Sequence, residues 1–251
     1  MTALTTRPSD LRVHDEPVTR PKRLARIAGV LYLTLAILGG LAQLYVRPRA
    51  IVPGDAAATA ANVATDTRLF QWFFAGELVS ITAFLLVAMA LYRLLRHVNP
   101  QVAAAMVIFV AVAAAVMSLN MLNHYAALTL ATNTGYIELL GAGAADAWVL
   151  LFLELHNVGW LIASTFFALW LLPLGYLAYR SGYFPRTLSV LLMFGCFSYL
   201  AEALPRMLFV HMPVAVEMAI AAPAGLAELW MIAYLLIRGV KTPTDSTLPT
   251  T

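Results

Sequence analysis

The amino-acid sequence predicts an all-α, polytopic membrane helical bundle with six transmembrane helices and both termini in the cytoplasm. Three observations carry this prediction: the composition, six long apolar segments, and the distribution of lysine and arginine along the chain. Of the 251 residues, 61% are hydrophobic and only 12% are charged, whereas a soluble domain has about 45–50% apolar and about 25% charged residues. This composition excludes an ordinary soluble globular domain.

Six apolar segments are each long enough to cross a hydrocarbon core about 30 Å thick, which requires about 20 helical residues. Helix-breaking residues separate them, among them Pro48 and Pro213. The predicted spans are residues 24–46, 70–95, 102–130, 147–178, 187–209 and 214–238. Together they form one transmembrane domain over residues 24–240, between a disordered cytoplasmic N-terminal tail (1–23) and a cytoplasmic C-terminal tail (241–251).

The basic residues set the orientation, because cytoplasmic loops of membrane proteins carry an excess of lysine and arginine. With the N-terminus inside, twelve of the sixteen basic residues fall on the cytoplasmic side. The four on the opposite side are Arg47, Arg49, Arg68 and Arg206. The sequence therefore predicts a multi-pass protein of the cell inner (plasma) membrane, with the lipid bilayer as its first partner. Since these charges follow topology, they predict no nucleic-acid partner.

The connection after the first span contains a predicted short helix. Asp55 precedes the run beginning at Ala56, and an aspartate there can accept hydrogen bonds from the unpaired amides of a first helical turn. Two interpretations stay open for this helix: a surface linker between two spans, or a lid over an outward-facing pocket.

Several polar side chains fall inside the predicted spans, where an ionisable group costs about 2.5–3.5 kcal/mol on insertion scales. Such groups usually face the interior of a bundle and pair with a partner, so they are the candidate ligand-binding or proton-binding residues. They are Glu77, Asn120, Asn123, His124, Glu154, His156, Asn157, Glu202, Arg206 and Glu228.

The direction of each span predicts the depth of these groups. Glu77, His124, Glu154 and Glu202 each lie six or seven residues from the outer end of a predicted span, which at 1.5 Å per residue is roughly 10 Å below the outer interface. Glu228 lies deeper, near the middle of the last span. The sequence thus predicts one polar layer in the outer half of the bundle.

Helical spacing predicts which of these side chains share a face. Asn120 and His124 are four residues apart, with Asn123 beside them, so the three share one face of the third span. On the fourth span, Glu154 and Asn157 are expected to look into the bundle, with Glu154 next to His124. His156 is expected to turn toward a different neighbour.

Glu202 and Arg206 are four residues apart on the fifth span, so they can form an ion pair within one helix. Pro205 between them is expected to kink that helix. On the last span, the small residues Ala221, Ala224 and Gly225 are expected to allow close approach of a neighbouring helix.

Several stretches together resemble a known family of bacterial proteins. They are RIAGVLYL (26–33), YVRPRAIVPGDAAATAANV (45–63), LYRLLRHVN (91–99), NMLNHYAALTL (120–130), LLFLELHNVGWLI (150–162) and GYLAYRSGYFPRTLSVLL (175–192). The chain resembles the domain-of-unknown-function 4386 family of bacterial integral membrane proteins over about residues 24–240. The resemblance implies a bacterial membrane location, and it supplies neither an activity nor catalytic residues.

Three hypotheses for the function stay open. In the first, the bundle binds or moves a small molecule, coupled to protons that Glu77, Glu154 and Glu228 carry. In the second, it is a structural or signalling protein whose polar layer only specifies helix packing. In the third, it is an intramembrane metal-dependent hydrolase with histidine and carboxylate ligands. The chain has no HExxH motif and no repeated histidine spacing, so the sequence favours a protein without enzyme activity and predicts no cofactor and no metal site.

Overall fold

The computed structural model describes residues 20–208 and 212–241, and within these ranges the chain forms helices and no strands. The helices are α1 (Pro21–Leu41), α2 (Arg47–Ala50), α3 (Ala56–Thr65), α4 (Thr67–Leu95), α5 (Pro100–Thr132), α6 (Thr134–Leu140), α7 (Ala142–Leu169), α8 (Leu171–Ser181), α9 (Arg186–Met207) and α10 (Val214–Ile237). Six uninterrupted or nearly uninterrupted segments of the described chain are long and apolar enough to cross a membrane. The predicted fold class and number of spans are therefore confirmed.

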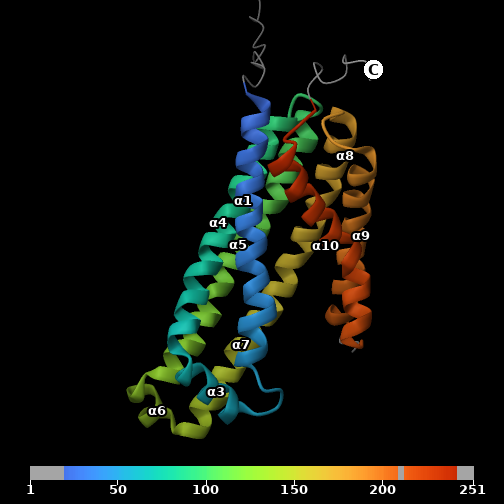
Figure 1. Cartoon of the computed structure of the whole chain (residues 1–251). Coiled ribbons are helices and arrows are strands. Elements are labelled where there is room, and N and C mark those ends of the chain that lie inside the picture. The colour runs from blue at the N-terminus through green and yellow to red at the C-terminus, as the bar shows by residue number, and fades with distance from the viewer. Residues whose placement is uncertain (1–19, 209–211, 242–251) are drawn as a thin grey trace, which may run out of the picture.

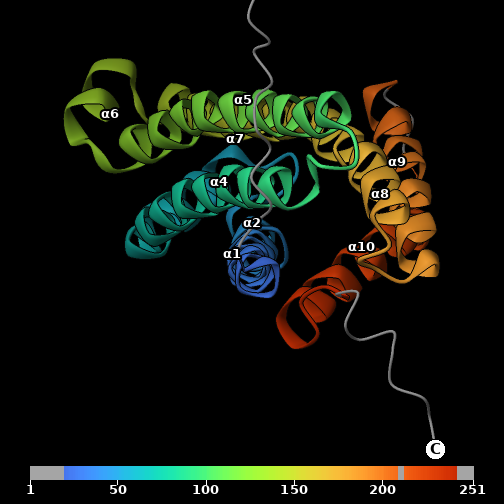
Figure 2. The same cartoon turned by 90° about the horizontal axis from the view of Figure 1, so that it is seen from above.

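The helices form two groups that meet near the end of the bundle where the described termini lie (Figures 1 and 2). In one group α1 packs on α4, α4 on α5, and α5 on α7; in the other, α8 and α10 both pack on α9. The start of α1 and the end of α10 lie at the same end of the bundle, and α3 and α6 lie at the other, which we call the α3–α6 end. The cytoplasmic location of the termini and the choice of membrane stay predictions from charge. Most of both predicted tails lies outside the described residues.

Three apolar clusters form among the described residues, the smallest of them around Ile81, Ala114 and Met121, and the two larger ones hold the ends of the bundle together. The larger of these two fills the end near the described termini and includes the fully buried side chains of Trp170, Phe84 and Leu91. The other lies at the α3–α6 end, where Val63 of α3 packs with Phe70 of α4 and residues of α5 and α7. Because burying such side chains fixes the helices at both ends, polar residues can be held between the clusters.

The first span is longer than predicted. A π-helical turn (Ala42–Val46) follows α1 and continues into α2, so the helix runs through Pro48 to Ala50. Pro48 occupies the first turn of α2, where a missing amide hydrogen costs little. The prediction that the span ends before Pro48 is therefore wrong. The helix continues past Pro48 and includes Arg47.

The fourth span is broken, although the sequence predicts one segment over residues 147–178. It consists of α7 and α8, which meet at Trp170. Pro173 explains the break, because a proline ring clashes with the carbonyl four residues earlier, here that of Leu169, the last residue of α7. The connection 133–146 also contains a short helix, α6, which the sequence analysis did not predict.

The predicted cap of the short helix α3 is confirmed. The Asp55 side chain accepts a hydrogen bond from the amide of Ala58 at 2.8 Å, and α3 begins at Ala56. We expect Asp55→Ala to lower the stability of α3 by about 0.5–2 kcal/mol, visible as faster hydrogen–deuterium exchange in peptides covering residues 56–65. Asp66 is the matched control, because it precedes α4 without a capping hydrogen bond from its side chain. Equal exchange in the two variants would contradict the role of Asp55.

Candidate functional site

Two groups of buried polar side chains lie apart from each other in the bundle. One group surrounds Glu228, which is 8% exposed. The Tyr32 hydroxyl donates to its Oε1 at 2.5 Å, and the Tyr199 hydroxyl donates to its Oε2 at 2.7 Å. These residues come from α10, α1 and α9, so one carboxylate joins three helices. Glu228 is predictable from the sequence as a charged residue within a span, whereas the two tyrosines are not, because their only sequence signal is a hydroxyl-bearing ring in mid-span.

Trp170 lies next to this group at the junction of α7 and α8. Its ring packs edge-on against Tyr32, with centroids 5.5 Å apart, and against Phe84 at 5.1 Å. The indole Nε1 is buried and has no hydrogen-bond partner among the described residues. The aromatic contacts of Trp170 therefore pack the larger apolar cluster against α1 and α4 without using its one polar atom.

The second group lies nearer the α3–α6 end and begins with two histidines. The rings of His124 on α5 and His156 on α7 have centroids 5.8 Å apart. His124 Nε2 lies 3.1 Å from the Phe70 carbonyl oxygen, and His156 Nδ1 lies 3.3 Å from that of Asn120. Asn120 Nδ2 donates to the His156 carbonyl at 2.7 Å. Asn120 and His156 thus tie α5 to α7 reciprocally, and Asn123 adds a bond to the Asn120 side chain at 3.0 Å.

The predicted faces of α5 are confirmed. On α7 the predictions for Glu154 and His156 are wrong, whereas Asn157 does face the bundle, where it accepts a hydrogen bond from Arg47. Asn120 and His124 are buried, and Asn123 is half-buried beside them. On α7 it is His156 that faces α5, whereas Glu154 is exposed. The buried face of α7 runs through Val149, Leu153 and His156, which are four and three residues apart, and this places Glu154 off that face.

Within residues 20–208 and 212–241, His124 and His156 have no third ligand that could complete a metal site. The described residues contain no group of three or more histidine, cysteine, aspartate or glutamate side chains able to hold a metal ion. Each histidine also has one ring nitrogen beside a backbone carbonyl. These residues do not fit a catalytic zinc site, which needs three protein ligands and an open position.

Arg47, which was not among the predicted site residues, lies beside the histidines. Its Nη1 donates to Gln43 Oε1 at 2.5 Å, and its Nη2 donates to Asn157 Oδ1. The guanidinium carbon lies 5.8 Å from the centroid of the Trp160 ring. All three contacts are with neutral groups. Arg47 makes no ion pair with any described residue, and it is half-buried.

Glu77 is the other charged candidate in this group. It is 7% exposed in the middle of α4, and it makes no hydrogen bond or ion pair with any described residue. Its carboxylate nevertheless interacts electrostatically with Arg47. An acid and a base therefore lie near each other in the same part of the bundle without direct contact.

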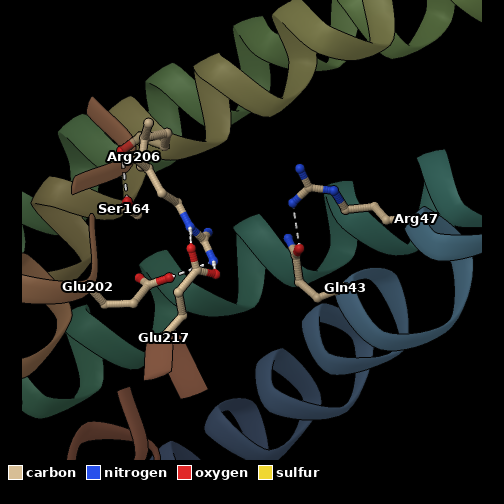
Figure 3. A network of polar contacts seen from close by, with 7 residues as sticks. Gln43, Arg47, Ser164, Glu202, Arg206 and Glu217 are labelled. Atoms are coloured by element: carbon tan, nitrogen blue, oxygen red, sulfur yellow. Dashed lines mark hydrogen bonds and ion pairs between the residues drawn. The ribbon is translucent and has the colours of Figure 1, made fainter. Parts of the chain in front are cut away.

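The predicted ion pair between Glu202 and Arg206 is confirmed at 2.8 Å. Arg206 also binds Glu217 of α10 at 2.6 Å, so this arginine joins the ends of α9 and α10. Figure 3 shows Arg206 with its two carboxylates on one side and Arg47 with Gln43 on the other. The two guanidinium groups extend toward each other and interact electrostatically.

A cavity of about 20 Å³ borders Arg47, Asn157, His124 and His156. A cavity needs about 10–15 Å³ on this measure to hold one water molecule. The space is therefore sufficient for about one water and too small for an organic ligand. In this conformation the cavity beside Arg47 admits no organic ligand unless its walls move.

Comparisons with known proteins place the chain in a family. Neither the curated proteins nor the solved structures contain a match to it. The family model described as Domain of unknown function (DUF4386) matches residues 27–239, close to the limits of the resemblance seen in the sequence. Since the match covers most of the 251 residues, the chain belongs to the Domain of unknown function (DUF4386) family of proteins.

Proposed function

We propose that this multi-pass membrane protein binds a small molecule through an acidic group, at Arg47 near the α3–α6 end of the bundle. The observation that carries the proposal is the set of neutral contacts around Arg47. Charged side chains inside a membrane protein are rare, and they pair with a partner or mark the path of a substrate. Arg47 has no partner of opposite charge in contact among the described residues.

The geometry around Arg47 suits a carboxylate. A guanidinium group has five N–H donors in a planar fork that matches a carboxylate or a phosphate. Gln43 and Asn157 each accept from one of the terminal nitrogens, which holds the fork in place and leaves other donors for a ligand. Trp160 supplies an aromatic face beside the cation.

The cavity must open for such a ligand to enter. Ile51 lines it and begins the connection to α3, in which Gly54 adopts a φ of +78° that favours glycine. Movement of this connection, with α3 as a lid, would expose Arg47. Of the two interpretations left open for α3, a linker or a lid, the proposal therefore adopts the lid.

The binding test uses the purified full-length protein in detergent, with the only cysteine as the reporter. Cys196 is 1% exposed, so a thiol-reactive fluorescent dye reports unfolding. We expect at least one of a panel of small carboxylic acids, amino acids and phosphate to raise the unfolding temperature. A ligand at 100 times its Kd stabilises by about 2.7 kcal/mol. Arg47→Gln is expected to abolish this gain.

Arg49→Gln is the matched control, because Arg49 lies on the same short helix, is exposed, and stacks on Tyr45 at 3.7 Å. It is expected to respond to the ligand as the wild type does. The proposal fails if nothing in the panel stabilises the wild type. It also fails if Arg47→Gln responds as Arg49→Gln does.

A packing role is the second candidate, and the reciprocal bonds between Asn120 and His156 favour it. If these bonds serve packing alone, Asn120→Ala lowers the free energy of unfolding by about 0.5–2 kcal/mol and leaves the ligand-induced rise in unfolding temperature unchanged. Loss of that rise in Asn120→Ala, with the fold intact, would instead place Asn120 in the binding site.

A further inference from the structure

We infer that the ligand is a zwitterion of amino-acid type, whose carboxylate binds Arg47 and whose ammonium group binds Glu77. The inference rests on the proposed function and adds the chemical class of the ligand and a second binding residue.

Glu77 lacks the partner that a buried acid requires. An isolated charge inside a membrane protein is costly unless it is paired, yet Glu77 makes no direct polar contact with any described residue.

Arg47 is the charged group that acts on Glu77, and the two do not touch. Arg206 does not compete for Glu77, because Glu202 and Glu217 already pair with it. The two unpaired charges have opposite signs, so together they are electrically balanced while each lacks a contact.

This balance selects the charge of the ligand. A simple anion at Arg47 would leave Glu77 unpaired, and a simple cation at Glu77 would leave Arg47 unpaired. A molecule that carries both charges completes both contacts and adds no net charge to the membrane interior. The two side chains come from neighbouring helical segments, because α4 packs against the π-helical turn that leads to Arg47.

The test compares each amino acid with the acid that lacks its amino group: glycine with acetate, L-alanine with propionate, and L-serine with 3-hydroxypropionate. The readout is the ligand-dependent unfolding temperature of the detergent-purified full chain, titrated to obtain a Kd. We expect the wild type to bind an amino acid at least about 10-fold more tightly than its matched acid, because a site built for a polar group rejects an analogue without it. In Glu77→Gln this ratio is expected to fall to within about 3-fold.

Two further variants keep the result interpretable. Glu77→Asp retains the charge with a shorter reach and is expected to keep part of the preference, whatever effect Glu77→Gln has on folding. Glu154→Gln is the matched control, because Glu154 is an exposed glutamate on α7, and it is expected to keep the full preference.

The outcomes separate this inference from the proposed function. Equal binding of amino acids and matched acids, with both lost in Arg47→Gln, overturns the zwitterion and leaves the site at Arg47 standing. A preference that survives in Glu77→Gln overturns the role of Glu77. The absence of any binding to the wild type overturns both proposals.

Discussion

Glu228→Ala is expected to lower the free energy of unfolding by about 2–6 kcal/mol. The carboxylate accepts one hydroxyl donor from α1 and one from α9, through Tyr32 and Tyr199. Removing it leaves two hydroxyl groups without an acceptor, and a buried unsatisfied donor costs about 1–3 kcal/mol. The unfolding of the detergent-purified protein is monitored through the labelling of Cys196, which is buried with Tyr32 in the larger apolar cluster.

Two variants make the Glu228 result specific. Glu154→Ala removes an exposed glutamate and is expected to change stability by less than about 0.5 kcal/mol. Glu228→Gln keeps one acceptor and adds a donor, so its effect is expected to lie between the two. If Glu228→Ala were as stable as Glu154→Ala, the three-helix junction would not contribute to the fold.

The same comparison separates packing from binding. Glu228 lies in the group with Tyr32 and Tyr199, apart from Arg47 and Glu77. The ligand-induced rise in unfolding temperature is therefore expected to be lost in Arg47→Gln and kept in folded Glu228→Gln. A loss of ligand response in both variants would show that the two polar groups act together.

Composition and segment length predicted the fold because they are local properties of the chain. Six apolar segments need only be counted, and the cap at Asp55 depends on neighbouring residues alone. The break at Trp170 was missed because Pro173 follows it by three residues, and a proline is tolerated in the first turn of a new helix as readily as it ends an old one.

The site was harder to predict because its contacts join distant segments. Arg47 meets Asn157 across 110 residues, and Tyr32 meets Glu228 across 196, and no pattern in one sequence encodes such pairs. Glu154 shows the limit of helical spacing: the period gives which residues share a face, while the packing of α7 on α5 decides which face is buried.

Gly175→Ala tests the closest approach of α8 and α9 and is expected to destabilise the protein by about 1–3 kcal/mol or more. An added Cβ would lie 2.6 Å from Met193 Cγ, 2.8 Å from the Ser189 carbonyl oxygen and 2.9 Å from the Met193 amide nitrogen. The methionine side chain can move aside, whereas the backbone atoms can move only if the helices separate. Small residues at helix interfaces in membranes serve such close packing.

Gly225→Ala is the control for Gly175→Ala, and it corrects an expectation from the sequence. Gly225 was expected to allow close helix approach together with Ala224, but a Cβ at Gly225 would meet nothing within 4 Å, whereas Ala224 packs against Gly195 of α9. Alanine favours a helix over glycine by about 1 kcal/mol, so Gly225→Ala is expected to be neutral or stabilising in the Cys196 labelling measurement. If Gly175→Ala lowers stability while Gly225→Ala does not, the helix contact lies at Gly175, because helix propensity alone predicts that both substitutions change stability in the same direction. Equal stability of the two variants would mean that α8 and α9 do not approach this closely.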